Sequence, residues 1–120
     1  MAHEPRLMRA LRDLLSGRRV AALGTLDADD PTQPFVSMVP YAVLPEGPAL
    51  VLHLSGLAAH TANLQAHPRA SLLVMAALAE DEPVHALARV TLDVVAETPL
   101  RDSAAWQAAR VVYLARFPEA

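Results

Sequence analysis

The chain contains no cysteine and no lysine. Without cysteine it cannot form a disulfide bond, use a thiol nucleophile, or bind zinc or an iron–sulfur cluster through sulfur. Without lysine it has neither a Schiff-base residue nor the lysine of a phosphate-binding P-loop. All ten basic residues are therefore arginines. Together with 13 acidic residues they give a net charge of −3, which argues against strong nonspecific binding to nucleic acid.

Aromatic side chains are scarce, at 4% of the chain, although hydrophobic residues make up 53%. A chain of 120 residues can form one modest core, which must here consist mainly of alanine, leucine and valine. Because few large side chains are available, we expect some apolar surface to be buried against a partner subunit. No apolar run approaches the roughly 20 residues of a membrane-spanning helix. Charged residues also interrupt the N-terminal segment, unlike a signal peptide. We therefore expect one cytoplasmic domain, residues 1–120, that does not enter a membrane.

Apolar periodicity predicts a mainly β (α+β) fold. Strands are expected over Val20–Leu26, Pro34–Leu44, Ala49–Leu54, Ala70–Met75 and Val84–Glu97. Leucines at helical spacing predict an N-terminal helix that ends at Gly17. A late helix is expected to start at Thr98-Pro99, with Trp106, Arg110, Tyr113 and Phe117 on one face. Pro40 would break a central strand, so we expect it at a bulge or a sheet edge. Five short strands separated by turns predict a small antiparallel barrel.

Residues 50–75 form the most informative segment. An apolar strand ends at Ser55-Gly56, about two helical turns follow, and Pro68 prevents their continuation. We interpret Ser55 as the residue that starts the turn and caps the helix. The N-terminus of such a helix offers free backbone N–H groups and a positive dipole end, which suit a phosphate. Further polar side chains lie in or near its first turns: His60, Thr61 and Asn63.

The sequence of residues 54–74 resembles the FMN-binding split barrels related to pyridoxamine 5′-phosphate oxidase, and among them the heme-utilisation (HugZ-like) branch. Residues 21–26 with 34–42 are similar to the first hairpin of that branch, and residues 113–120 to its late helix. The resemblance implies a small antiparallel split β-barrel with flanking helices. It also implies a homodimer whose cofactor sites are shared between subunits. The family usually continues past the late helix into another strand, so we expect a short domain or a barrel with an open edge.

The resemblance implies an FMN site, and several of its residues also have a purely structural interpretation. Ser55 can be a plain helix cap, and polar residues of a short helix usually face water. Tyr41 can lie in the core or beside a flavin ring. His60 and His67 would lie about 10 Å apart along a helix, too far to share a metal ion, so no metal site is predicted. The expected cofactor-binding residues are Ser37, Val39, Pro40, Tyr41, Ser55, His60, Thr61 and Asn63.

The chain departs from the resembled oxidase where that enzyme holds its phosphate. Arginine and lysine residues of the oxidase are replaced here by Ser37 or Ala42 and by residues 58–60. A dianionic phosphate would lose its charge-assisted hydrogen bonds, so we expect weak FMN affinity unless a partner subunit supplies Arg69 or Arg89. The heme-utilising branch uses a histidine ligand from a C-terminal extension. In this chain the ligand would have to be another histidine: His53, His60 or His85.

Three functions remain open. The first is an FMN-dependent oxidoreductase that acts on an unknown small-molecule substrate. The second is a protein that binds or handles heme. The third is a barrel scaffold that has lost its cofactor. No Ser-His-Asp triad, carboxylate pair or set of metal ligands indicates a competing class of enzyme.

Overall fold

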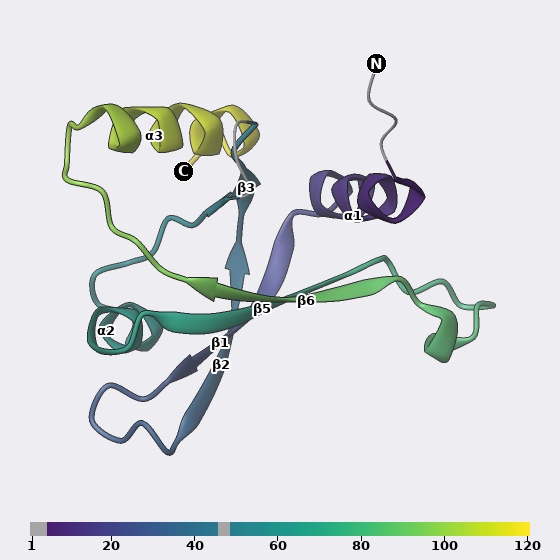
Figure 1. Ribbon diagram of the computed structural model, residues 1–120, viewed down its shortest axis with the longest axis horizontal. Helices are drawn as coiled ribbons and strands as arrows, with labels where there is room; N and C mark the ends of the chain where they lie inside the picture. Colours follow the sequence, from purple (N-terminus) through teal and green to yellow (C-terminus); the bar gives the residue numbers. More distant parts are fainter. Residues whose placement is uncertain (1–4, 46–48) are drawn as a thin grey trace.

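The computed structural model describes residues 5–45 and 49–120. Strands and helices are arranged as antiparallel sheets with flanking helices (Figure 1). The elements are α1 (Arg6–Gly17), β1 (Val20–Leu26), β2 (Pro34–Pro40), β3 (Ala42–Val43), β4 (Leu50–Val51), α2 (Ala59–Ala66), β5 (Arg69–Met75), the 3-10 turn η1 (Val84–Ala86), β6 (Arg89–Val95) and α3 (Ala104–Arg116). No helix within the described residues is long and apolar enough to cross a membrane.

The main sheet has four strands in the order β2-β1-β5-β6, and every neighbouring pair is antiparallel. A second, two-stranded sheet pairs β3 with β4. The predicted α+β fold with antiparallel sheets is therefore confirmed. Alternation along β1 turns Ala21, Leu23 and Thr25 inward, as the period of two in a strand requires.

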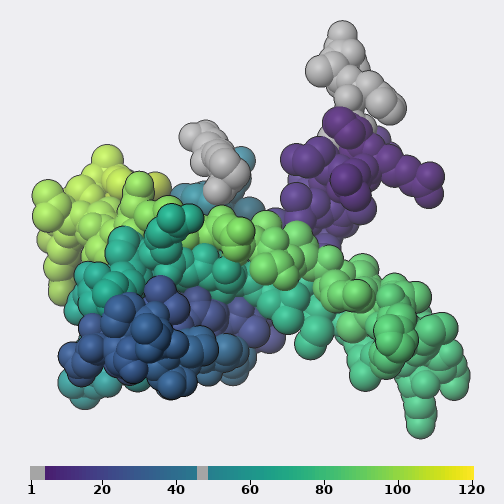
Figure 2. Space-filling model, turned by 60° about the horizontal axis from the view of Figure 1, so that its bottom comes forward, coloured from purple at the N-terminus to yellow at the C-terminus, as the bar shows by residue number. Residues whose placement is uncertain are grey.

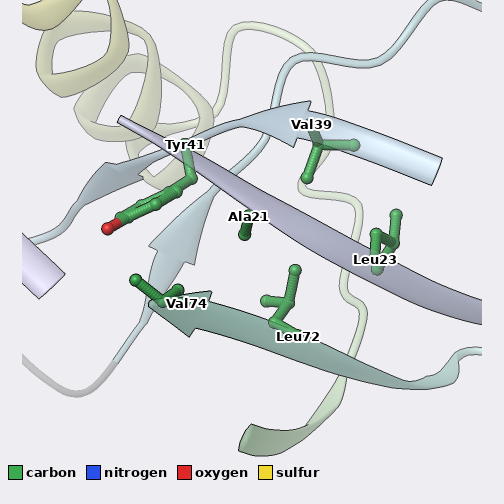
Figure 3. Packing of buried hydrophobic residues seen from close by; sticks show 6 residues of the cluster. All are labelled: Ala21, Leu23, Val39, Tyr41, Leu72 and Val74. Carbon is green, nitrogen blue, oxygen red and sulfur yellow. The ribbon is translucent and has the colours of Figure 1, made fainter. Parts of the chain in front are cut away.

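The core lies on one face of the main sheet (Figure 3). Its buried residues are Ala21, Leu23, Val39, Tyr41, Leu72 and Val74. Leu14 and Leu15 of α1 and Leu64 of α2 pack against this cluster. A smaller cluster joins Tyr113 and Phe117 of α3 to Ala42 of β3. The core is thus made largely of small and medium aliphatic side chains, as the composition predicts.

The predicted strand over residues 34–44 changes its partner at Tyr41. Strand β2 ends at Pro40, and the next residues pair with β4 instead. The Tyr41 N–H still donates to the Arg19 carbonyl at 3.0 Å. Pro40 has no N–H to continue the ladder, and it lies at the end of an edge strand, which confirms its expected position.

Two other predicted strands are shorter than expected. In the segment 49–54 only Leu50 and Val51 pair with another strand. In the segment 84–97 the first residues form the turn η1, and β6 begins at Arg89. The N–H of Ala86 donates to Pro83 and that of Leu87 to Val84, so local bonds replace the ladder. Apolar alternation does not distinguish these residues from the strand that follows.

Helix α3 begins five residues later than Pro99. Its cap is Ser103, whose hydroxyl accepts a hydrogen bond from the Trp106 N–H at 3.2 Å. Asp102 before it has φ = 67°, a left-handed conformation that aspartate tolerates better than most residues. A turn therefore occupies the residues predicted to begin the helix. Of the four residues expected on one helical face, Tyr113 and Phe117 are buried, Trp106 is half-buried and Arg110 is exposed.

Candidate cofactor site

The candidate site is centred on a hydrogen bond between His60 and Ser37. His60 lies in the first turn of α2 and Ser37 on the edge strand β2. The His60 Nδ1 and Ser37 Oγ atoms are 2.9 Å apart, and both residues are half-buried. Within the described ranges, the other ring nitrogen, Nε2, has no hydrogen-bond partner. The contact therefore orients the imidazole while leaving Nε2 unoccupied.

The direction of this hydrogen bond decides what His60 can bind. When Nδ1 carries the proton and donates to Ser37, Nε2 presents a lone pair that can ligate a metal ion. When the Ser37 hydroxyl donates to Nδ1, Nε2 carries the proton and can donate to an anion. A hydroxyl supports both arrangements, so the pair is chemically compatible with a heme iron and with a phosphate.

Contrary to the prediction, Ser55 does not cap helix α2. Helix α2 begins at Ala59, and its cap is Ala58, which makes no side-chain hydrogen bond. A turn separates Ser55 from the start of α2. In this turn the Ala58 N–H donates to the Ser55 carbonyl at 3.2 Å. The Ser55 hydroxyl instead accepts from the Leu57 N–H, also at 3.2 Å.

Thr61 reinforces the same loop. Its hydroxyl donates to the Ser55 carbonyl oxygen and so ties the helix to the preceding turn. The backbone N–H groups of Ala59 and His60 have no acceptor within the helix, as expected for a first turn. This N-terminus therefore provides two backbone donors beside the imidazole.

Asn63 faces the protein interior and not the solvent. Its side chain is only 3% exposed. Its Oδ1 accepts from the Ala28 N–H at 2.8 Å, and its Nδ2 donates to the Thr25 hydroxyl at 3.0 Å. The amide thus fastens α2 to β1 and to the turn that follows it. This arrangement differs from the predicted role in cofactor binding, because a buried amide satisfied in this way stabilises the fold.

Val39 and Tyr41 also point into the core, where Val39 is 1% and Tyr41 0% exposed. The Tyr41 hydroxyl donates to the Leu15 carbonyl at 2.6 Å, so the core interpretation of this residue is confirmed. Pro40 between them is half-buried at the end of β2. Of the eight expected residues, the structure brings four polar ones to the start of α2: Ser37, Ser55, His60 and Thr61.

Sequence reasoning missed Thr25 as the partner of Asn63. The signal was available, because the alternation in β1 turns Thr25 inward together with Ala21 and Leu23. A buried hydroxyl needs a hydrogen-bond partner. Only the packing of α2 on β1 identifies that partner.

The site contains few charges. In the described part of the chain, no arginine hydrogen-bonds to Ser37, His60 or Thr61. Arg69 and Arg89 both occur on exposed strand positions of the main sheet. No group of three or more His, Cys, Asp or Glu among residues 5–45 and 49–120 could hold a metal ion. The site therefore offers a single imidazole rather than a phosphate clamp or a protein metal cage.

The other candidate histidines lie elsewhere. His53 contacts the edge of the Tyr113 ring, with centroids 5.6 Å apart, and so lies near α3. His85 is exposed in the turn η1. Neither has a hydrogen bond from another side chain to orient its ring. Among the three, only His60 is both half-buried and oriented.

Residues 7–120 match the family of pyridoxamine 5′-phosphate oxidase, and the chain belongs to this family. Its relatives include the heme oxygenase HutZ of Vibrio cholerae serotype O1, which is 31% identical over 101 residues. That match covers 84% of this chain and 55% of the relative. This chain therefore spans about half the length of that protein.

Solved structures share the fold. A heme binding protein from Mycobacterium smegmatis has a TM-score of 0.79 and 37% identity, with 95% of this chain and 44% of that chain covered. The heme storage protein HutZ from Vibrio cholerae has a TM-score of 0.80 and 30% identity. The match covers 96% of this chain and 78% of that chain. The predicted split-barrel fold is thus confirmed. The predicted relationship to heme-utilisation proteins is confirmed as well.

Proposed function

We propose that this protein binds heme, with His60 as the axial ligand. The observation that carries the proposal is the half-buried His60 ring, which Ser37 orients through Nδ1 while Nε2 remains available. Relatives named for heme binding, heme storage and heme oxygenation match most of the chain and support the same cofactor. This reverses the order given by the sequence, which placed FMN first.

The charge of the site supports heme over FMN. An FMN phosphate carries about two negative charges and is normally held by charge-assisted hydrogen bonds. Here the available donors are backbone N–H groups, the Ser55 hydroxyl and His60, because the Thr61 hydroxyl already donates to the Ser55 carbonyl oxygen. Heme needs an axial ligand, which a histidine nitrogen can supply, and an apolar surface for its macrocycle. When bound, its iron would supply redox chemistry that the axial ligand tunes.

The proposal concerns heme binding and handling. The match to the heme oxygenase covers 55% of that protein. FMN remains the second candidate. It is favoured by membership of the oxidase family and by the free N–H groups of Ala59 and His60. Without a cationic partner we expect an FMN dissociation constant of about micromolar.

A titration distinguishes these cofactors. Hemin and FMN are added separately to purified protein and to His60→Ala, and binding is followed by the visible absorption spectrum. We expect a Soret band with one heme per chain, and its loss or a tenfold weaker affinity in His60→Ala. His85→Ala is the matched control because it removes an exposed histidine from η1. Heme binding that is unchanged in His60→Ala, or FMN binding tighter than heme binding, would contradict the proposal.

A further inference from the structure

Leu57 has the most exposed large apolar side chain in the part of the chain that the structure describes. It is 99% exposed, whereas Leu100 and Leu7, the next in order, are 82% and 81% exposed. A single exposed leucine is common on protein surfaces and needs no explanation by itself. The position of Leu57 is unusual, however, because it lies in the turn that leads into α2, three residues before the proposed heme ligand His60.

The fold does not use this leucine in the way that is usual for its position. Leu57 comes directly before the cap Ala58, and an apolar residue there often packs against the fourth residue of the helix. In α2 that residue is Ala62, which is itself exposed. The side chain of Leu57 therefore adds almost no buried apolar surface to the folded chain.

The backbone that carries Leu57 is nevertheless held by hydrogen bonds to Ser55. The Leu57 N–H donates to the Ser55 hydroxyl, and the Ala58 N–H donates to the Ser55 carbonyl, both at 3.2 Å. The Thr61 hydroxyl donates to the same carbonyl and ties the turn to the helix. These bonds fix the place at which an apolar side chain is presented to solvent.

The segment around Leu57 carries no formal charge. Between residues 49 and 68 the chain has no aspartate, glutamate, arginine or lysine. The residues that separate Leu57 from His60 are Ala58 and Ala59, which are small and apolar. The chain thus surrounds the imidazole of His60 with apolar groups along the sequence, and such a surface suits an apolar ligand better than a charged one.

This segment lies at the surface of the molecule. Figures 1 and 2 show α2, in teal, beside the β1–β2 hairpin, in blue. Ser37 of this hairpin contacts His60. A ligand held at the free Nε2 of His60 can therefore meet both the hairpin and the turn that carries Leu57.

We propose that Leu57 packs against the macrocycle of the heme that His60 binds. This inference rests on the proposed function and adds to it the apolar contact that a porphyrin needs. A porphyrin is broad and apolar, so a heme ligated by a residue in the first turn of α2 covers side chains beside that turn. Burial of a leucine that the free protein leaves in water stabilises the complex, chiefly by slowing its dissociation.

Two ligands separate the contribution of Leu57 from that of His60. Hemin can use both the iron–nitrogen bond and the apolar contact, whereas metal-free protoporphyrin IX can use only the apolar contact. We expect Leu57→Ser to weaken the binding of both ligands about tenfold. We expect His60→Ala to weaken the binding of hemin alone. The Soret band follows hemin, and porphyrin fluorescence follows protoporphyrin IX.

Two further variants serve as controls. Leu57→Met keeps an apolar side chain and should bind both ligands as the original protein does. Leu100→Ser removes another highly exposed leucine, from the loop before α3, and should not change binding. Because Leu57 is 99% exposed, Leu57→Ser should keep the original melting temperature and circular dichroism spectrum. Weaker binding would then not result from a loss of structure.

The possible results distinguish this inference from the proposed function. Hemin binding that requires His60 but is equal in Leu57→Ser and the original protein would overturn the inference and leave the proposed function standing. Hemin binding that does not require His60 would overturn both. A smaller assembly of ligand-free Leu57→Ser in sedimentation, with unchanged hemin affinity, would assign the leucine to a contact between protein chains and would also overturn the inference.

Discussion

The Asn63 amide donates a hydrogen bond to the Thr25 hydroxyl at 3.0 Å, and this buried contact joins helix α2 to the first strand of the sheet. The same amide accepts from the Ala28 N–H. Because His60 lies three residues earlier on α2, the position of its ring on Ser37 depends on this attachment. The buried contacts of Asn63 therefore help to hold His60 in its position at the candidate site.

Replacing Asn63 with alanine should destabilise the protein. The change leaves the Thr25 hydroxyl and the Ala28 N–H without their partner, and such a loss costs about 1–3 kcal/mol. Urea unfolding followed by circular dichroism measures this change in the free energy of unfolding. Gln65→Ala, at an exposed position of the same helix, should change it by less than about 0.5 kcal/mol. Equal stability of the two variants would show that the buried contact is not important.

Removing the Ser37 hydroxyl should weaken heme binding without a comparable loss of stability. Ser37→Ala leaves His60 in place but removes the group that orients its ring, and loss of such a supporting contact lowers metal affinity by about tenfold or more. A heme titration with the position of the Soret band as a second readout tests this. Ser16→Ala is the control, because the Ser16 hydroxyl donates to the Arg12 carbonyl within α1 and is not part of the candidate site. Unchanged heme affinity in Ser37→Ala would remove Ser37 from the site.

Stability should fall at alkaline pH because of Tyr41. Burial raises the pKa of the Tyr41 phenol, and the charges of Arg116 and Arg18 oppose this shift. The folded protein therefore favours the neutral phenol. The free energy of unfolding should decrease as the pH rises above about 10, the ordinary value for tyrosine, until the folded pKa is passed. Burial also raises the pKa of Tyr113, which acts in the same direction.

Tyr41→Phe separates this pH effect from packing. The variant loses the hydrogen bond to the Leu15 carbonyl, so at neutral pH it should be less stable by about 1 kcal/mol. Its stability should also decline less steeply between pH 9 and 11. Denaturant unfolding at several pH values measures both effects. An equally steep decline in both proteins would assign the pH dependence to other groups.

Elements with strong local signals could be predicted from the sequence. Strand β1 has the predicted bounds, α1 ends at the predicted Gly17, and Pro40 lies at a sheet edge. Pro68, which precedes β5, likewise ends α2 where expected. These features depend on alternation, glycine and proline, which act over a few residues. The late helix was misplaced because Thr98-Pro99 and Ser103 are both acceptable starts by local criteria.

The sequence by itself determined the membership of the oxidase family, the antiparallel α+β fold and the absence of cysteine and lysine chemistry. Only the tertiary structure decided which of the polar residues around α2 face the site. His60 meets a serine 23 positions earlier, and Asn63 meets a threonine 38 positions earlier. Both residues lie on the same short helix, and local sequence rules do not distinguish their environments. The packing of the helix against β1 and β2 turns Asn63 inward and leaves His60 at the partly exposed edge.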